Sequence, residues 1–155
     1  KPRFVLPLAA IVLAAGVMWF WGADERRVNH ACDTWLEHRE DLRWVVSETR
    51  EAGERAQARG ANHVSGQYND LERALSYVDQ WHAVGPAVLS RLHGSADASG
   101  LERGAHAAFE SVDGGLTVLE DLIHNGSPSD VAEWLPEMGA RFQFVDDVCL
   151  VAARQ

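Results

Sequence analysis

The sequence of 155 residues predicts an all-α protein, in which an N-terminal transmembrane helix precedes an up-down-up-down four-helix bundle closed by one disulfide. Three observations lead to this fold class. An uncharged run opens the chain, apolar residues then recur four times at helical spacing, and one cysteine stands near each end of the part that follows the run. We find no segment with the strict polar–apolar alternation that is typical of strands.

The composition is strongly acidic, with a formal net charge of −9 from 23 acidic and 14 basic residues. This excess of carboxylates argues against nucleic acid as a partner and against a basic patch for binding a membrane surface. The length suffices for one domain beyond the first apolar run. We therefore expect a membrane anchor in residues 1–23 and a bundle in residues 24–155.

The predicted anchor spans residues 4–23, twenty positions without a charged side chain. A helix of this length extends about 30 Å, which matches the hydrocarbon thickness of a bilayer. Lys1 and Arg3 precede the run, and Trp19 and Trp21 close it in the manner of an interfacial aromatic belt. A cleaved signal peptide is the alternative, but the length of the run and its bulky end favour an uncleaved anchor.

The first two helices of the bundle are expected at about 24–59 and 69–93, where apolar residues recur every three or four positions. Arg39 interrupts the first apolar stripe, so it either pairs with an acid inside the bundle or marks where the helix outruns the core. His82 lies on the second stripe, and Pro86 is expected to kink the second helix.

The last two helices are expected at about 99–125 and 128–154, and they carry the most regular stripes. The pair Gly114 and Gly115 would cost about 1–2 kcal/mol relative to alanine in a helix. That cost is tolerable if a neighbouring helix packs closely there. Pro136 either bends the last helix or marks its start.

Capping residues agree with these helix limits. Gly126 is expected to end the third helix, and short glycine-rich loops favour antiparallel neighbours. The expected caps are Asn69 with Glu72, Ser99 with Glu102, and Ser127 and Pro128 with Asp130.

The two cysteines are expected to meet. Cys32 lies about two turns beyond the anchor, and Cys149 lies near the C-terminus on a helix that returns to the membrane. In an up-down-up-down bundle both sulfurs reach the same level on inward stripes. Two buried free thiols are the alternative. A stable disulfide indicates an oxidising compartment, so we expect the bundle on the periplasmic, extracytoplasmic side of a bacterial cytoplasmic membrane and the N-terminus inside.

Nothing in the sequence forms a catalytic signature. The pairs Asp79 with His82 and Asp121 with His124 share the carboxylate-x-x-His spacing of diiron bundles, but they fall at opposite ends of neighbouring helices. A core imidazole bonded to a neighbour is the expected role of His82. We predict no enzyme activity, no cofactor or metal, and no small-molecule substrate.

Several residues are candidates for contact with a protein partner. Trp44 points about 200° from the apolar stripe of its helix, so we expect an outward side chain that anchors a partner. Ala10 and Ala14 form a small-x-x-x-small face in the predicted anchor, and Trp19 and Trp21 lie at its end.

The layout resembles that of the small single-pass accessory subunits of actinobacterial respiratory supercomplexes, which dock on the outer face of cytochrome bcc and aa3 oxidase. The resemblance rests on the anchor at 4–23, the cysteine segments "ACDTW" and "DDVC", and the helical composition. It implies a non-enzymatic subunit that takes part in electron transport by binding an integral membrane complex. The family's redox ligands lie in other subunits, so no functional residue is carried over.

Two other functions suit the same layout. One is the extracytoplasmic ligand-sensing bundle of a membrane receptor, whose cytoplasmic signalling domain would precede Lys1. The other is a bundle enzyme or metal carrier.

Overall fold

The protein folds into four helices in the computed structural model, which describes the backbone of residues 5–64 and 69–154 and the side chains of 22–64 and 71–154. These described ranges contain no strand, so the all-α prediction is confirmed. The four helices are α1 (Val5–Ala58), α2 (Asn69–Arg91), α3 (Gly100–Asn125) and α4 (Pro128–Ala152).

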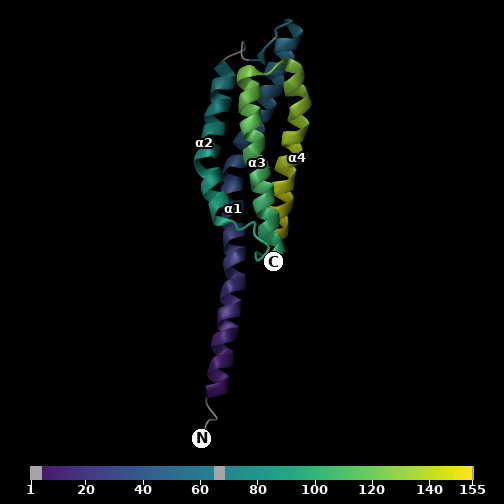
Figure 1. Ribbon diagram of the computed structural model, residues 1–155. Coiled ribbons are helices and arrows are strands. Elements are labelled where there is room, and N and C mark those ends of the chain that lie inside the picture. The colour runs from purple at the N-terminus through teal and green to yellow at the C-terminus, as the bar shows by residue number, and fades with distance from the viewer. Residues whose placement is uncertain (1–4, 65–68, 155) are drawn as a thin grey trace.

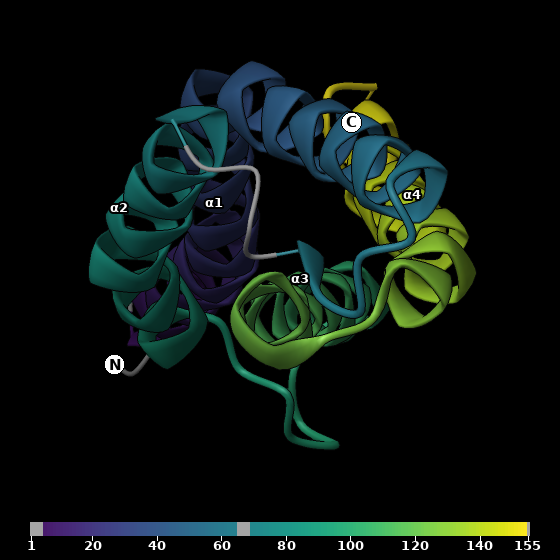
Figure 2. The same cartoon turned by 90° about the horizontal axis from the view of Figure 1, so that it is seen from above.

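The helices form a ring in which α1 and α3 each lie between α2 and α4 (Figure 2). Successive helices run in opposite directions, and α1 continues beyond the bundle towards the N-terminus (Figure 1). We call the end of the bundle from which α1 projects the base. The C-terminus and the connection between α2 and α3 also lie at the base (Figure 1).

A layer of aromatic rings, one from each helix, occupies the interior. Trp35 of α1 meets Trp81 of α2 edge-on at 5.8 Å between ring centroids, and lies 5.3 Å from Phe142 of α4. Phe109 of α3 stacks on Trp81 at 6.2 Å. The two tryptophans and Phe109 are completely buried, and burial of each such side chain contributes about 1.5–3 kcal/mol.

The structure corrects the predicted position of His82. The inward face of α2 is centred one position earlier, on Trp81, and His82 is half-buried at the flank towards α3. The reason is that a bundle helix buries a stripe wider than one row of residues, and the larger apolar side chain takes the centre. Similarly, Val148 is buried in α4 whereas Cys149 is half-buried.

The predicted caps of the last two helices are partly confirmed. At α4 the full capping box forms between Ser127 and Asp130, and the N–H of Gly126 ends α3 by donating to the carbonyl of Leu122. At α3 the Ser99 hydroxyl accepts from the Glu102 N–H at 3.1 Å, but the Glu102 carboxylate does not return to Ser99.

The two interior prolines lie within continuous helices. Pro136 falls eight positions after the first residue of α4, so it does not mark the start of that helix. Pro86 likewise lies inside α2.

Within the residues whose side chains are described, no helix offers an apolar stretch of the length that crossing a membrane requires. The predicted span 4–23 lies outside these residues except for Gly22 and Ala23. Ala10, Ala14, Trp19 and Trp21 also lie outside them. The anchor and its candidate contacts therefore stay predictions.

The two adjacent glycines of α3 differ in their surroundings, and the expected close packing at this point is confirmed. A Cβ at Gly115 would stand 2.7 Å from Met138 Sδ and 2.8 Å from Arg141 Cδ, both on α4. A Cβ at Gly114 would meet no atom within 4 Å.

We predict opposite effects for alanine at the two positions. Gly114→Ala should raise the free energy of unfolding by about 0.5–1 kcal/mol because alanine favours the helix. Gly115→Ala should lower it by about 1 kcal/mol, since overpacking against Met138 and Arg141 outweighs the same helical gain. Urea unfolding followed by circular dichroism measures both, and equal stabilisation by the two variants would contradict the close approach of α3 and α4.

Candidate functional site

The base of the bundle is closed by the disulfide between Cys32 of α1 and Cys149 of α4, with their Cα atoms 5.5 Å apart. The pairing confirms the prediction for residues 117 positions apart in the chain. The bond joins the last turn of α4 to the part of α1 that enters the bundle. The first and last helices of the bundle are thereby covalently tied at the base.

A part-buried ion pair lies at the same end of the molecule. Arg27 of α1 donates from Nε to Glu102 Oε1 at 2.7 Å and from Nη2 to Oε2 at 3.1 Å, in bidentate geometry. The Glu102 side chain is completely buried, and Oε1 also accepts from the backbone N–H of His93 at 3.0 Å. Asp24 accepts from Arg27 and, at 3.3 Å, from the N–H of Ser99. Together these bonds fasten the α2–α3 connection to α1.

The ionisation of this pair follows from its contacts. Burial raises the pKa of the Glu102 carboxyl, but the hydrogen bonds from Arg27 and His93 and the charge of Arg27 outweigh burial and leave this pKa below its ordinary value. The hydrogen bond to Glu102 raises the pKa of Arg27. Both groups are therefore charged at neutral pH.

Sequence reasoning assigned Glu102 to a cap and gave Arg27 no role. A signal was present, because Glu102 follows the apolar Leu101 and Arg27 precedes the core residue Val28. Each charge therefore stands beside a buried stripe. Their pairing depends on the level at which α1 and α3 meet, which no spacing in the sequence specifies.

The structure also settles the role of Arg39. Its guanidinium lies 3.1 Å from Glu40 and 3.7 Å from Asp146 of α4. The same Asp146 accepts from the Trp35 indole at 2.7 Å and from Arg43 at 2.5 Å. Arg39 thus pairs with an acid of the neighbouring helix at the edge of the bundle.

Trp44 points towards α2, which corrects the expectation that it faces away from the bundle. Its ring meets Tyr77 of α2 edge-on at 5.7 Å, and the Arg73 guanidinium lies 5.2 Å from the ring centroid. Trp44 and Tyr77 remain half-buried, and Arg73 is exposed. We call these three residues the aromatic patch.

The carboxylate-x-x-His pairs do not converge. His82 lies 3.6 Å from Asp113 and 3.5 Å from Glu120, both on α3, while Asp79 of its own helix is exposed. His82 therefore lies near carboxylates of the neighbouring helix, as expected, but at the flank of α2 and not in the core.

The second pair begins directly after Glu120 on α3, so the two pairs lie closer together than the opposite helix ends at which the sequence predicted them. Asp121 accepts from Asn125 at 2.8 Å, and His124 is exposed in the last turn of the helix. Among the described residues, no three His, Cys, Asp or Glu side chains are grouped in a way that could hold a metal ion.

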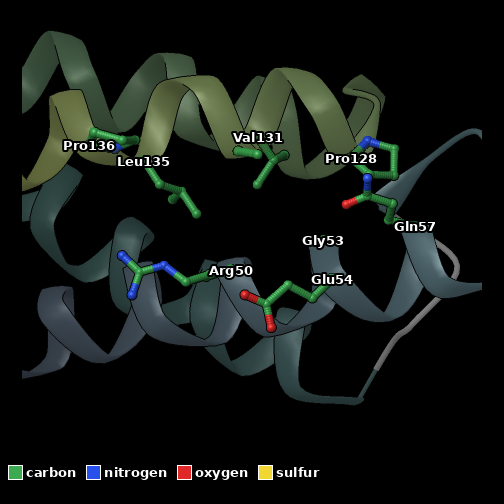
Figure 3. Close-up of a pocket in the computed structure, with 9 residues that line it drawn as sticks. Arg50, Gly53, Glu54, Gln57, Pro128, Val131, Leu135 and Pro136 are labelled. Carbon is green, nitrogen blue, oxygen red and sulfur yellow. The ribbon is translucent and has the colours of Figure 1, made fainter.

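A groove lies between α1 and α4 at the end opposite to the base (Figure 3). Its volume is about 210 Å³, below the range of about 300–1,000 Å³ that is usual for small-molecule sites. Arg50, Glu54 and Gln57 of α1 form its polar wall, and Val131 and Leu135 of α4 form its apolar floor. The groove has room for one large side chain.

We predict that removing the disulfide destabilises the bundle. The double variant Cys32→Ala and Cys149→Ala should lower the free energy of unfolding by about 4–5 kcal/mol, because the bond closes a loop of more than one hundred residues in the unfolded chain. Urea unfolding measures the difference, with the reduced natural chain as the control. A non-reducing mass that shows two free thiols would contradict the pairing.

We predict that Glu102→Gln lowers the free energy of unfolding by about 2 kcal/mol at pH 7, because the charged hydrogen bonds to Arg27 are lost. Since the folded-state pKa of Glu102 lies below its ordinary value of 4.5, its contribution is complete above about pH 4.5 and is lost as the pH falls further.

The variant should therefore lose less stability than the natural chain between pH 4.5 and pH 3, as measured by urea unfolding at each pH. Glu110→Gln is the matched control on α3, because the Glu110 side chain is 70% exposed. Parallel pH profiles for the natural chain and Glu102→Gln would contradict the role of the ion pair.

Comparison with known proteins leaves the family of this chain open. No family model matches the chain, and neither a curated protein nor a solved structure matches it. The resemblance to respiratory accessory subunits accordingly rests on the layout of the sequence alone.

Proposed function

We propose that this protein is a non-enzymatic accessory subunit of a larger bacterial membrane complex, such as a respiratory supercomplex. It would contribute one transmembrane helix and a rigid helical domain on the outer face. The observation that carries the proposal is the double attachment of α1 at the base, by the disulfide to α4 and by the Arg27–Glu102 ion pair to α3.

This attachment favours a structural role for mechanical reasons. The helix α1 runs without interruption from Val5 to Ala58, so the bundle would continue directly from the predicted anchor at 4–23. Both attachments lie within ten residues of the end of that run. Helices α1 and α4 cannot slide past one another while the sulfurs are bonded. A bundle held in this way holds partner surfaces at a constant height above the lipid.

The proposed location rests on the same bond. A disulfide that closes a bundle persists in oxidising compartments and is rare in the bacterial cytoplasm. The bundle would therefore lie on the periplasmic or extracytoplasmic side of the cytoplasmic membrane, with the N-terminus inside.

The aromatic patch is the proposed contact with the partner complex. Trp, Tyr and Arg are the side chains that most often dominate the energy of protein interfaces. Here Trp44, Tyr77 and Arg73 hold one another in place through ring and cation–π contacts. A pre-ordered group of this kind loses little conformational entropy on binding.

A ligand-sensing bundle is the second candidate, and the groove between α1 and α4 is the observation that favours it. A ligand in the groove would contact both α1, which continues from the predicted anchor, and α4, which returns to the base. Such a signal would travel by sliding of α4 along α1, and the disulfide between these helices opposes that movement. We therefore place this function second.

A pull-down of the full chain from membranes in mild detergent, followed by mass spectrometry, tests the proposal. We expect integral membrane subunits in constant stoichiometry with the bundle. Recovery of the chain alone, even after crosslinking in the membrane before the pull-down, would overturn the proposal. A chain that co-purifies as a part of a longer signalling protein would favour the sensor.

We predict that Trp44→Ala reduces the recovery of these membrane subunits at least tenfold, which corresponds to about 1.4 kcal/mol of binding free energy. The matched control is Phe144→Ala on α4, because Phe144 is also a large apolar residue that is 43% exposed. Thermal unfolding of both variants checks that the bundle is intact. Equal recovery with Trp44→Ala and Phe144→Ala would exclude the aromatic patch as the contact.

A further inference from the structure

Four exposed arginines surround the base, and each comes from a different helix or its end. Arg26 lies on α1, Arg91 ends α2, Arg103 lies in the first turns of α3, and Arg154 follows α4. We call them the basal arginines. Arg27 is not one of them, because Glu102 and Asp24 already engage its guanidinium.

Side-chain contacts place the basal arginines close to one level along α1. Arg91 Nη1 lies 2.7 Å from His30 Nε2, and Arg103 donates to the carbonyls of Ala96 and Ala98 in the α2–α3 connection. That connection is bonded to Asp24 through the Ser99 N–H.

The C-terminal end reaches the same level. Arg154 stands five positions beyond Cys149, which is bonded to Cys32. At 1.5 Å per residue, the basal arginines lie within about two helical turns of Ala23, where the predicted apolar run ends.

We propose that the basal arginines bind the phosphate groups of lipid headgroups, an inference that rests on the membrane anchor of the proposed function. The headgroup layer on each side of the hydrocarbon is about 5–8 Å thick, and the backbones of these arginines lie within about 11 Å of Ala23, so that extended side chains reach that layer. The guanidinium group pairs with phosphate through two parallel hydrogen bonds, and its long aliphatic stem reaches towards the interface. The base would then stand directly on the membrane surface.

The distribution of charge agrees with this orientation. Besides the paired Asp24 and Glu102, the exposed carboxylates of Glu25, Asp33 and Asp97 lie at the base, but more acids lie towards the opposite end, where they are kept from anionic headgroups. The basal arginines are spread around a rim and do not form one basic face. Binding without the anchor is therefore not expected, in keeping with the overall charge of −9. The acids towards the opposite end include Glu48, Glu51, Glu54, Glu72, Asp121, Asp130 and Glu133.

Solid-state NMR of the full chain in vesicles of phosphatidylethanolamine and phosphatidylglycerol tests the proposal. The parent chain for this experiment carries ¹³C at Cζ of every arginine. It also carries Arg3→Gln, which removes the arginine that precedes the apolar run. We expect ³¹P nuclei of the lipid to dephase part of the guanidinium signal. The triple variant Arg26→Gln, Arg91→Gln and Arg154→Gln should lose more than half of that dephased signal.

The matched control is the triple variant Arg50→Gln, Arg55→Gln and Arg59→Gln at the opposite end, which should keep the full dephased signal. Absence of dephasing in the parent chain, or an equal loss in both triple variants, overturns the proposal. Extraction with alkaline carbonate separates the hypothesis of the headgroup contact from the hypothesis of the membrane anchor. A retained chain without dephasing contradicts the headgroup contact alone, whereas a released chain contradicts the anchor and with it this inference.

Discussion

The attachment of α1 at the base is the constraint on which the rest of the structure depends. One covalent bond joins α1 to α4, and one part-buried ion pair joins α1 to α3 and to the α2–α3 connection. Burial of a charge pair is costly unless its hydrogen bonds are complete, and here Glu102 receives three donors. The base therefore has a specific geometry, since a shift along α1 would leave a buried carboxylate without its partners.

Above the base, the bundle combines nonspecific burial with specific polar contacts between helices, among them those of Asp146. The rings of Trp35, Trp81, Phe109 and Phe142 supply large apolar surfaces from all four helices. Aromatic rings alone tolerate small rotations of the helices. Asp146 reduces this freedom, because it must satisfy the Trp35 indole and the neighbouring arginines together. A rigid body that carries an aromatic patch, a groove and a basal rim at separate places suits a subunit that joins several surfaces.

Much of the fold could be predicted from residue spacing. The observed bounds of α2, α3 and α4 agree with the predicted ranges to within two residues, because apolar periodicity and the Ser127 cap act locally. The disulfide also followed, since topology brings the first and last helices together at one end. The candidate site was predicted only in part. The orientation of Trp44 was wrong because a helical wheel for one helix does not include the side chains of its neighbours.

The sequence by itself determined the helical class, the order of the helices and the pairing of the cysteines, since these depend on periodicity and on end-to-end topology. Only the tertiary structure decided that Trp81 and not His82 enters the core, and that Glu102 pairs with Arg27 seventy-five positions away. It also decided that Gly115 lies against Met138. Each of these depends on the rotation and relative height of two helices. Those quantities result from the packing of all side chains at once, so no local pattern encodes them.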